Sequence, residues 1–262
     1  MRARPTVLLN TPEIELWPAH LLRARSNADA RVLARARHVM RRKRDGRFLA
    51  AAGDAGIDAL MHGWRREPGM DVALRRLREV DAPHLHDRDL SLDRIAHRLD
   101  ALGLDAPAYE SRTGLALVAE PAALAFAGFD RYRRPLWLRA PAARDWHRMQ
   151  GAAQREGIVL EAISGYRSHD YQLGIFERKR ARGQSVETIL TVNAAPGYSE
   201  HHSGRALDIA APGEPPAEES FESTSAFAWL RDNAAAFDFA MSYPRDNPHG
   251  IVYEPWHWCH RG

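Results

Sequence analysis

The sequence predicts an α+β fold in which a small, mostly antiparallel sheet with flanking helices is preceded by a helical N-terminal region. Helix-like and strand-like segments intermix after residue 107. Several strand-to-strand connections there are too short for the crossover helix that parallel strands need. The chain has 262 residues, 45% of them hydrophobic, which is enough to bury a core in one or two domains.

The first 107 residues are expected to be helical and form a region of unknown role. The apolar residues fall among arginines and polar residues with helical spacing, and helices are predicted at 19–44, 53–65, 69–79 and 90–103. In the last of these, Ser91 can cap the first turn and Gly103 can end the helix. The segment Leu104–Arg112, which contains Pro107, is predicted to be a linker. A second domain then follows at residues 108–262.

Residues 108–262 are expected to alternate short strands with helices. Strands are predicted at Leu115–Val118, Leu136–Leu138, Ile158–Ile163, Arg205–Ala210, Phe239–Ser242 and Ile251–Tyr253. Helices are predicted at Pro141–Glu156, Ser168–Arg182 and Ser225–Phe237. Proline is tolerated at the start of the first helix because that position needs no amide donor.

The N-terminal region is basic. Residues 1–50 hold 12 Lys+Arg against 4 acidic residues, a local charge of +8, while the whole chain carries +3. A basic helix here could contact an anionic lipid surface, an acidic partner or nucleic acid. Nucleic acid is disfavoured because no aromatic interleaving or DNA-reading motif accompanies the arginines. A solvated helix packed on the rest of the protein is the simpler interpretation.

Composition also excludes several classes of protein. The single cysteine, Cys259, excludes a disulfide framework and a multi-thiolate zinc site within one chain. The sequence shows no run of about 20 apolar residues, the length that a membrane span needs. The apolar run Val7–Leu9 is too short for the core of a secretory signal. As written, the sequence is therefore expected to be cytoplasmic.

The most informative stretch is residues 196–208. It places His201 and Asp208 seven positions apart, with Gly204 and Ala206 between them. Small residues leave the turn free of bulk, so both side chains could reach one point.

A second stretch, residues 253–258, supplies His257 with Glu254 three positions ahead. Catalytic zinc is usually held by three protein ligands and keeps a fourth position open. Together with His201 and Asp208, His257 would complete such a set. Glu254 would remain as a carboxylate that could act as a general base in metal-assisted hydrolysis.

The joint pattern resembles a known family. Ser199-x-His201-x-x-Gly204-x-Ala206-x-Asp208, followed by Glu254-Pro-Trp-His257, is similar to the LAS metallopeptidases, and specifically to the VanY-type D-alanyl-D-alanine carboxypeptidases. An upstream block, Ser164-Gly-Tyr-Arg167-Ser with Gln172, also matches in the family's order. The resemblance covers about Leu115 to Trp258 and leaves the first 107 residues unassigned.

This resemblance implies one zinc ion held by His201, Asp208 and His257. It implies Glu254 as the catalytic base and Arg167 as the group that stabilises the oxyanion of the scissile carbonyl. The implied reaction is attack by zinc-activated water on the terminal D-Ala-D-Ala bond, or a related D-amino acid bond, of peptidoglycan stem peptides or precursors.

Other residues near the motifs are secondary candidates. Ser199, Tyr198 and Gln172 are expected to line the pocket and bind the terminal carboxylate or neighbouring amides of the substrate. Trp256 could form a wall of the pocket. His202 should point away from the metal, because neighbours along an extended chain face opposite sides. Cys259 and His260 are expected to have no catalytic duty.

Three alternatives stay open. An L,D-carboxypeptidase or a D,D-dipeptidase would use the same metal chemistry on the same fold. A cell-wall-binding module that has lost catalysis is a third interpretation. The resemblance also implies a place in the cell envelope or periplasm, which conflicts with the lack of a visible export signal.

Overall fold

The computed structural model describes residues 5–79 and 88–262. The chain forms two compact units. The first comprises the described residues of Met1–Leu90 with Pro121–Phe126, and the second comprises Ser91–Glu120 with Ala127–Gly262. The predicted boundary between residues 107 and 108 lies inside the second unit. Arg2 and Arg4, which contribute to the predicted basic segment, lie outside the described residues.

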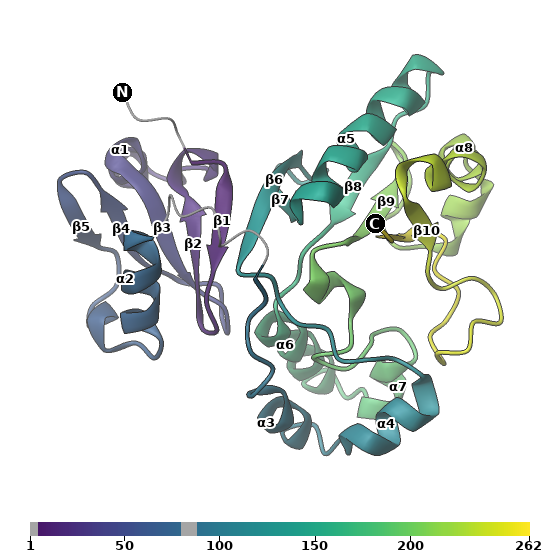
Figure 1. Ribbon diagram of the computed structural model, residues 1–262, viewed down its shortest axis with the longest axis horizontal. Coiled ribbons are helices and arrows are strands. Elements are labelled where there is room, and N and C mark those ends of the chain that lie inside the picture. Colours follow the sequence, from purple (N-terminus) through teal and green to yellow (C-terminus); the bar gives the residue numbers. More distant parts are fainter. Residues whose placement is uncertain (1–4, 80–87) are drawn as a thin grey trace. The chain divides into compact units, whose positions relative to one another are not determined.

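The first unit is built on antiparallel strands that lie side by side in one sheet (Figure 1). They are β1 (Val7–Asn10), β2 (Ile14–Pro18), β3 (Ala36–Arg42), β4 (Phe48–Gly53), β5 (Gly56–Ala59) and the beginning of β6 (Ala123–Phe129). Their spatial order is β5-β4-β3-β2-β1-β6. In the second unit, β7 (Pro135–Leu138) pairs with β6.

Alternating side chains give this sheet two packed faces. Met40 and Ala50 belong to a core shared with Met70 and Ala73 of α2 (Met70–Arg78). Their chain neighbours Val39 and Ala51 belong to a different cluster, which α1 (Asn27–Arg35) covers with partly buried apolar residues. Because successive strand residues point to opposite faces, one short strand can serve both clusters.

The prediction of a helical N-terminal region is wrong for most of this unit. The range 19–44 contains α1 but also all of β3, and 53–65 contains β5 and no α-helix. Of the ranges predicted in this unit, only 69–79 is helical as predicted, in α2. Alanine favours helices, yet the alanines of β4 pair with β3 and β5 on its two sides, because tertiary pairing overrides a weak local propensity. The basic segment is therefore not one continuous helix.

The second unit begins with two short helices, α3 (Ile95–Asp100) and α4 (Ala106–Thr113). The first lies within the predicted range 90–103. The second replaces the predicted linker: Asp105 accepts a hydrogen bond from the amide of Ala108 at 2.8 Å, and Pro107 sits in the first turn, where its missing amide costs nothing. Leu115–Val118 and Ile251–Tyr253 are not strands. None of the helices in the described ranges is long and apolar enough to cross a membrane.

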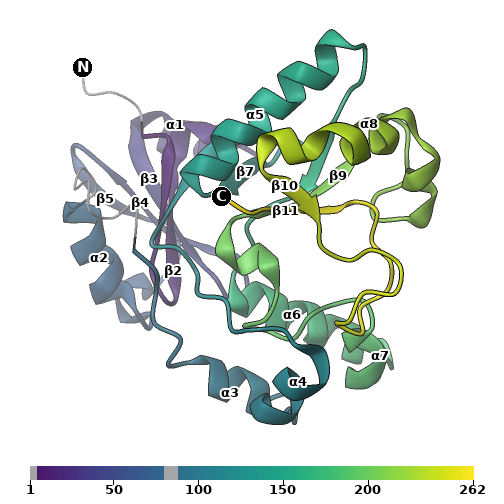
Figure 2. The same ribbon diagram turned by 45° about the vertical axis from the view of Figure 1, so that its right-hand side comes forward.

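The remaining elements of this unit surround a small antiparallel sheet. The helices are α5 (Ala140–Arg155), α6 (His169–Arg180), α7 (Val186–Leu190) and α8 (Ser225–Asn233), and the strands are β8 (Glu161–Ser164), β9 (Ala206–Ala210), β10 (Phe239–Met241) and β11 (His257–His260). The strand order is β10-β11-β9-β8, with antiparallel pairing throughout. Figure 2 shows α5 and α8 on one side of these strands and α3, α4, α6 and α7 on the other. The α+β class with a small antiparallel sheet and flanking helices is confirmed.

Candidate active site

The register of the small sheet brings three chemically active residues into line. Asp208 lies on β9 and faces Ser164 on β8 and His257 on β11 in the strand pairing. Directly paired residues project from the same face of a sheet. Ser164 accordingly donates a hydrogen bond to Asp208 Oδ2 at 2.5 Å, and His257 Nδ1 lies 3.2 Å from Asp208 Oδ1.

His201 also lies next to Asp208. It belongs to a short 3-10 helix, η4 (Glu200–Ser203), just before β9. Gly204 ends η4 with φ 69°, a left-handed conformation that favours glycine. His201 Nδ1 lies 2.7 Å from the carbonyl oxygen of Gly165, which leaves Nε2 at 3.3 Å from Asp208 Oδ1. At Gly165, a Cβ atom would lie 2.9 Å from a methyl carbon of Leu136 and 3.0 Å from the carbonyl oxygen of Trp137, so a larger residue would force these neighbours or the Gly165 backbone to move.

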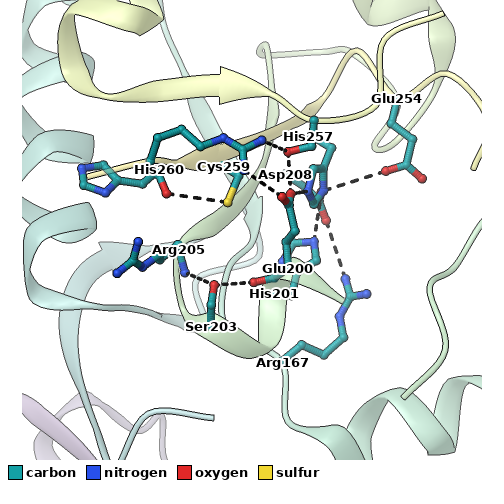
Figure 3. A network of polar contacts seen from close by, with 12 residues as sticks. Arg167, Glu200, His201, Ser203, Arg205, Asp208, Glu254, His257, Cys259 and His260 are labelled. Atoms are coloured by element: carbon teal, nitrogen blue, oxygen red, sulfur yellow. Dashed lines mark hydrogen bonds and ion pairs between the residues drawn. The ribbon is translucent and has the colours of Figure 1, made fainter. Parts of the chain in front are cut away.

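His201, Asp208 and His257 thus form a cluster in which the possible ligand atoms all lie within 4.8 Å of one another (Figure 3). All three are buried. Two imidazole nitrogens and a carboxylate oxygen match the donor types that zinc prefers at sites with an open position. The ring nitrogens that face Asp208 are Nε2 of His201 and Nδ1 of His257, since the other two nitrogens face Gly165 and Glu200.

The protonation of these three residues reflects burial and their mutual contacts. Burial lowers the pKa of His201 and outweighs the carboxylate of Asp208, which favours the neutral ring that a metal needs. Burial opposes ionisation of Asp208, but the two histidines hold its pKa well below the usual range. For His257, burial acts downward, yet hydrogen bonds to Asp208 and Glu200 prevail and raise the pKa to about 10.

Glu254 and Arg167 flank the cluster, and in Figure 3 Glu254 lies to its upper right and Arg167 to its lower right. Glu254 Oε2 lies 3.8 Å from His257 Nδ1, and burial raises the pKa of Glu254 to about 7. An Arg167 guanidinium nitrogen lies 3.6 Å from Asp208 Oδ2, and another donates to Gln172 Oε1 at 3.2 Å. A carboxyl with a pKa near neutrality can both accept and release a proton.

A cavity of about 320 Å³ opens onto these residues. Of the secondary candidates, Ser199, Gln172 and Trp256 line it. Tyr198 is absent from the lining; it is buried, and its hydroxyl donates to Glu110 at 2.8 Å. The remaining lining residues, apart from the groups named above, are Lys179, Val192, Asn193, Ala194, Ala217, Tyr243, Ile251 and Val252.

His202 lies outside the cluster of His201, Asp208 and His257, but the predicted reason is wrong, because both histidines lie on η4 and not in an extended segment. Its Nε2 accepts a hydrogen bond from the amide of Gly197 at 3.1 Å, so its Nδ1 donates to the carbonyl of Arg167 at 2.6 Å. The ring therefore holds the backbone of a flanking site residue. His260 contacts Asp145 at 3.1 Å, and Cys259 is buried without a disulfide.

Sequence reasoning missed two residues that belong to this site. Glu200 Oε2 lies 2.9 Å from His257 Nε2, on the side of the ring away from the ligand cluster. A carboxylate in that position fixes the tautomer and orientation of a metal-binding histidine. Its only signal in the sequence is that it precedes His201. Lys179 lines the cavity and lies seven residues after Gln172 on α6, a spacing that could have revealed a shared helix face.

Two histidines and an aspartate that converge beside a buried glutamate are the residue types that metal-assisted hydrolysis uses. Residues 135–262 match the family model of VanY, described as D-alanyl-D-alanine carboxypeptidase. These residues form a VanY-type peptidase domain of the LAS fold.

Individual relatives share about half of the chain. A putative carboxypeptidase, YodJ, of Bacillus subtilis (strain 168) is 36% identical over 49% of this chain and 48% of its own length. A D-alanyl-D-alanine carboxypeptidase of Enterococcus faecalis (strain ATCC 700802 / V583) is 34% identical over 42% of this chain and 43% of its own length. The structure of the LdcB LD-carboxypeptidase is 36% identical, with a TM-score of 0.45 over 48% of this chain and 60% of that one. The chain thus spans about half the length of the curated relatives it matches.

Proposed function

We propose that the chain is a zinc-dependent carboxypeptidase that hydrolyses the terminal D-Ala-D-Ala bond, or a related D-amino acid bond, of peptidoglycan stem peptides or precursors. The observation that carries this proposal is the convergence of His201, Asp208 and His257 to within 4.8 Å beside the cavity. The family match of residues 135–262 supports the class of bond.

The donor set fits one zinc ion, held by His201 Nε2, His257 Nδ1 and a carboxylate oxygen of Asp208. Bound zinc supplies a Lewis acid that polarises a carbonyl and makes a water molecule more acidic. Glu254 acts as the base that takes the proton from the attacking water and returns it to the departing amine. Arg167 is permanently charged and stabilises negative charge on the carbonyl oxygen. Ser199, Gln172 and Trp256 contact the peptide in the cavity.

The test compares metal-depleted protein with protein reloaded with one equivalent of zinc, with metal content measured in each. The substrates are a pentapeptide ending in D-Ala-D-Ala, the corresponding tetrapeptide and free D-Ala-D-Ala. We expect the pentapeptide to lose one D-Ala in the zinc-loaded form alone. Faster cleavage of the tetrapeptide would identify an L,D-carboxypeptidase, and faster cleavage of the dipeptide a dipeptidase. Binding of zinc and peptide without any cleavage would overturn the enzyme proposal in favour of a binding module.

A further inference from the structure

Lys179 is a second cation at the cavity, in addition to Arg167. It lies on α6, two turns after Gln172, and both side chains line the cavity. Residues seven apart share one face of a helix, so the fold presents these two groups on the same side. The sequence contains only one other lysine, Lys43, which lies in the first unit.

The ammonium of Lys179 has a neutral partner. Its Nζ donates to Asn193 Oδ1 at 2.6 Å, and Asn193 also lines the cavity. Among residues 5–79 and 88–262, no carboxylate oxygen forms an ion pair with it, whereas Arg167 lies 3.6 Å from Asp208. Burial and the positive charge of Arg167 lower the pKa of Lys179, while Glu254 acts in the opposite direction. Lys179 therefore lies in the electrostatic field of Arg167 and Glu254, and no ion pair within the described residues neutralises its charge.

The other polar groups of this wall are largely occupied. The Gln172 amide accepts from Arg167 and donates to the carbonyl of Ala194 at 2.8 Å. Arg167 is in turn close to Ser164 and Asp208. An ammonium has three donors, and Asn193 accounts for one of them. Lys179 thus retains hydrogen-bonding capacity for a negatively charged group that enters the cavity.

We propose that Lys179, held in place by Asn193, is a specificity-determining residue that binds a carboxylate of the substrate peptide. This inference rests on the proposed function, because a carboxypeptidase substrate carries a carboxylate at its terminus. Glu254 would repel that group, and of the two side-chain cations that line the cavity Arg167 already lies 3.6 Å from Asp208, so Lys179 is the one left to attract it. A side-chain carboxylate on the peptide could supply the same chemistry, and the experiment distinguishes the two sources.

The experiment measures kcat and KM of zinc-loaded full-length protein and its Lys179→Met variant, which keeps the aliphatic stem and removes the charge. Three peptides are compared: one with both carboxylates, one amidated at the terminus and one with its side-chain carboxylate amidated. We expect Lys179→Met to raise KM about 10- to 100-fold on the first peptide, the effect of losing one charge-assisted hydrogen bond, with a change of less than about threefold in kcat. The variant should have no further effect on the peptide that lacks the recognised carboxylate.

Matched variants separate this role from general electrostatics. Arg178→Met removes one charge from the adjacent position of α6, where Arg178 lies over the ring of Tyr171 at 5.5 Å, and should leave KM unchanged. Lys179→Arg should recover part of the lost affinity because it restores the charge. An equal increase in KM on all three peptides, or an equal effect of Arg178→Met, would overturn the inference.

Failure of this inference can be told apart from failure of the proposed function. If the wild-type protein cleaves the peptides but Lys179→Met has an unchanged KM on all of them, the inference is wrong and the proposed function stands. If the wild-type protein cleaves none of them, calorimetric binding of the intact first peptide to wild-type protein and Lys179→Met still tests carboxylate recognition. Equal affinity of the two proteins would then overturn the inference as well.

Discussion

Buried charges are organised differently in the two units of this chain. In the first unit, Arg42 lies between Asp45 and Glu67, with a nitrogen–oxygen distance of 2.5 Å to each. The hydrogen bonds that Arg42 donates to Asp45 are the main reason why the pKa of Arg42 is raised. In the second unit, three carboxylates gather around the single ring of His257, those of Asp208, Glu254 and Glu200. In the first arrangement Arg44 and Arg47 also lie 3.4 and 3.7 Å from Glu67 and Asp45, so its acids are matched by arginines. The second contains more carboxylates than its histidines can neutralise.

This difference indicates which cluster serves a ligand. A paired cation such as Arg42 needs nothing from outside the protein. In the acid-rich cluster, burial raises the pKa of Glu254 to about 7, and hydrogen bonds to Asp208 and Glu200 raise that of His257 to about 10, so protons partly offset the negative charge of the cluster. A bound divalent cation would take the place of these protons and would lower the pKa values of the groups around it. Buried groups with displaced pKa values in a cavity are for this reason candidates for function.

The largest effect on catalysis is expected for Glu254 of the second unit, with Glu67 of the first unit as its control. We expect Glu254→Gln to lower kcat by about 10²- to 10⁴-fold, the contribution of a general base, while bound zinc is retained because Glu254 is outside the three-residue ligand cluster. The measurement is steady-state hydrolysis of the pentapeptide together with metal analysis. The control is Glu67→Gln in the first unit, which should leave kcat unchanged. Normal turnover by Glu254→Gln would contradict its role as the base.

A smaller effect is expected for the carboxylate on the outer side of His257. Glu200→Gln keeps the size of the side chain but weakens its hold on Nε2 of that ring. We expect zinc affinity to fall about 10- to 100-fold, as for other residues that support a metal ligand from behind. Competition with a chromogenic chelator gives the affinity directly. An unchanged affinity would show that the contact seen in the structure does not orient the ring.

The sequence predicted features that depend on spacing along the chain and missed features that depend on contacts between distant segments. The approach of His201 to Asp208 is traceable to their spacing and to the small residues Gly204 and Ala206 between them, and His257 to its position three residues after Glu254. Glu200 was missed because only the approach of η4 to β11 places it against His257. Strand β4 was missed because an alanine-rich segment has a helical propensity that neighbouring strands reverse.

Within the first unit, a buried and an exposed ion pair should contribute differently to the free energy of unfolding. Arg42→Met should destabilise the first unit by about 1–3 kcal/mol, because it leaves Asp45 and Glu67 without their shared partner. Arg35→Met is the matched control, since Arg35 and Asp58 are exposed and 3.6 Å apart; its effect should be within about 0.5 kcal/mol. Urea denaturation followed by circular dichroism measures both variants. Equal effects would show that burial does not distinguish the two pairs.

The pH dependence of catalysis should follow Glu254. In the metal-free protein burial raises the pKa of this carboxyl to about 7, and a base acts only when it is ionised, so kcat/KM should rise with pH and then level off. A positive ion nearby favours the ionised form, so the acidic limb of the zinc-loaded enzyme should fall below pH 7. A pH profile on the pentapeptide locates this limb. Activity that declines as the pH is raised from 5 to about 7 would contradict the assignment.

The smallest effect is expected for Cys259, a buried residue that lies close to the cluster but has no assigned role. Cys259 follows His257 by two positions on β11. Burial, with the negative charge of Glu200, raises the pKa of its thiol to about 12, and the thiol form is a poor nucleophile. We expect Cys259→Ala to change kcat/KM by less than about twofold, because losing one small buried side chain mainly affects stability. Iodoacetamide at neutral pH should leave the folded protein unlabelled while labelling the urea-unfolded chain. Rapid labelling of the folded protein together with loss of activity would mean that Cys259 is open to the cavity and that burial does not set it apart from the cluster.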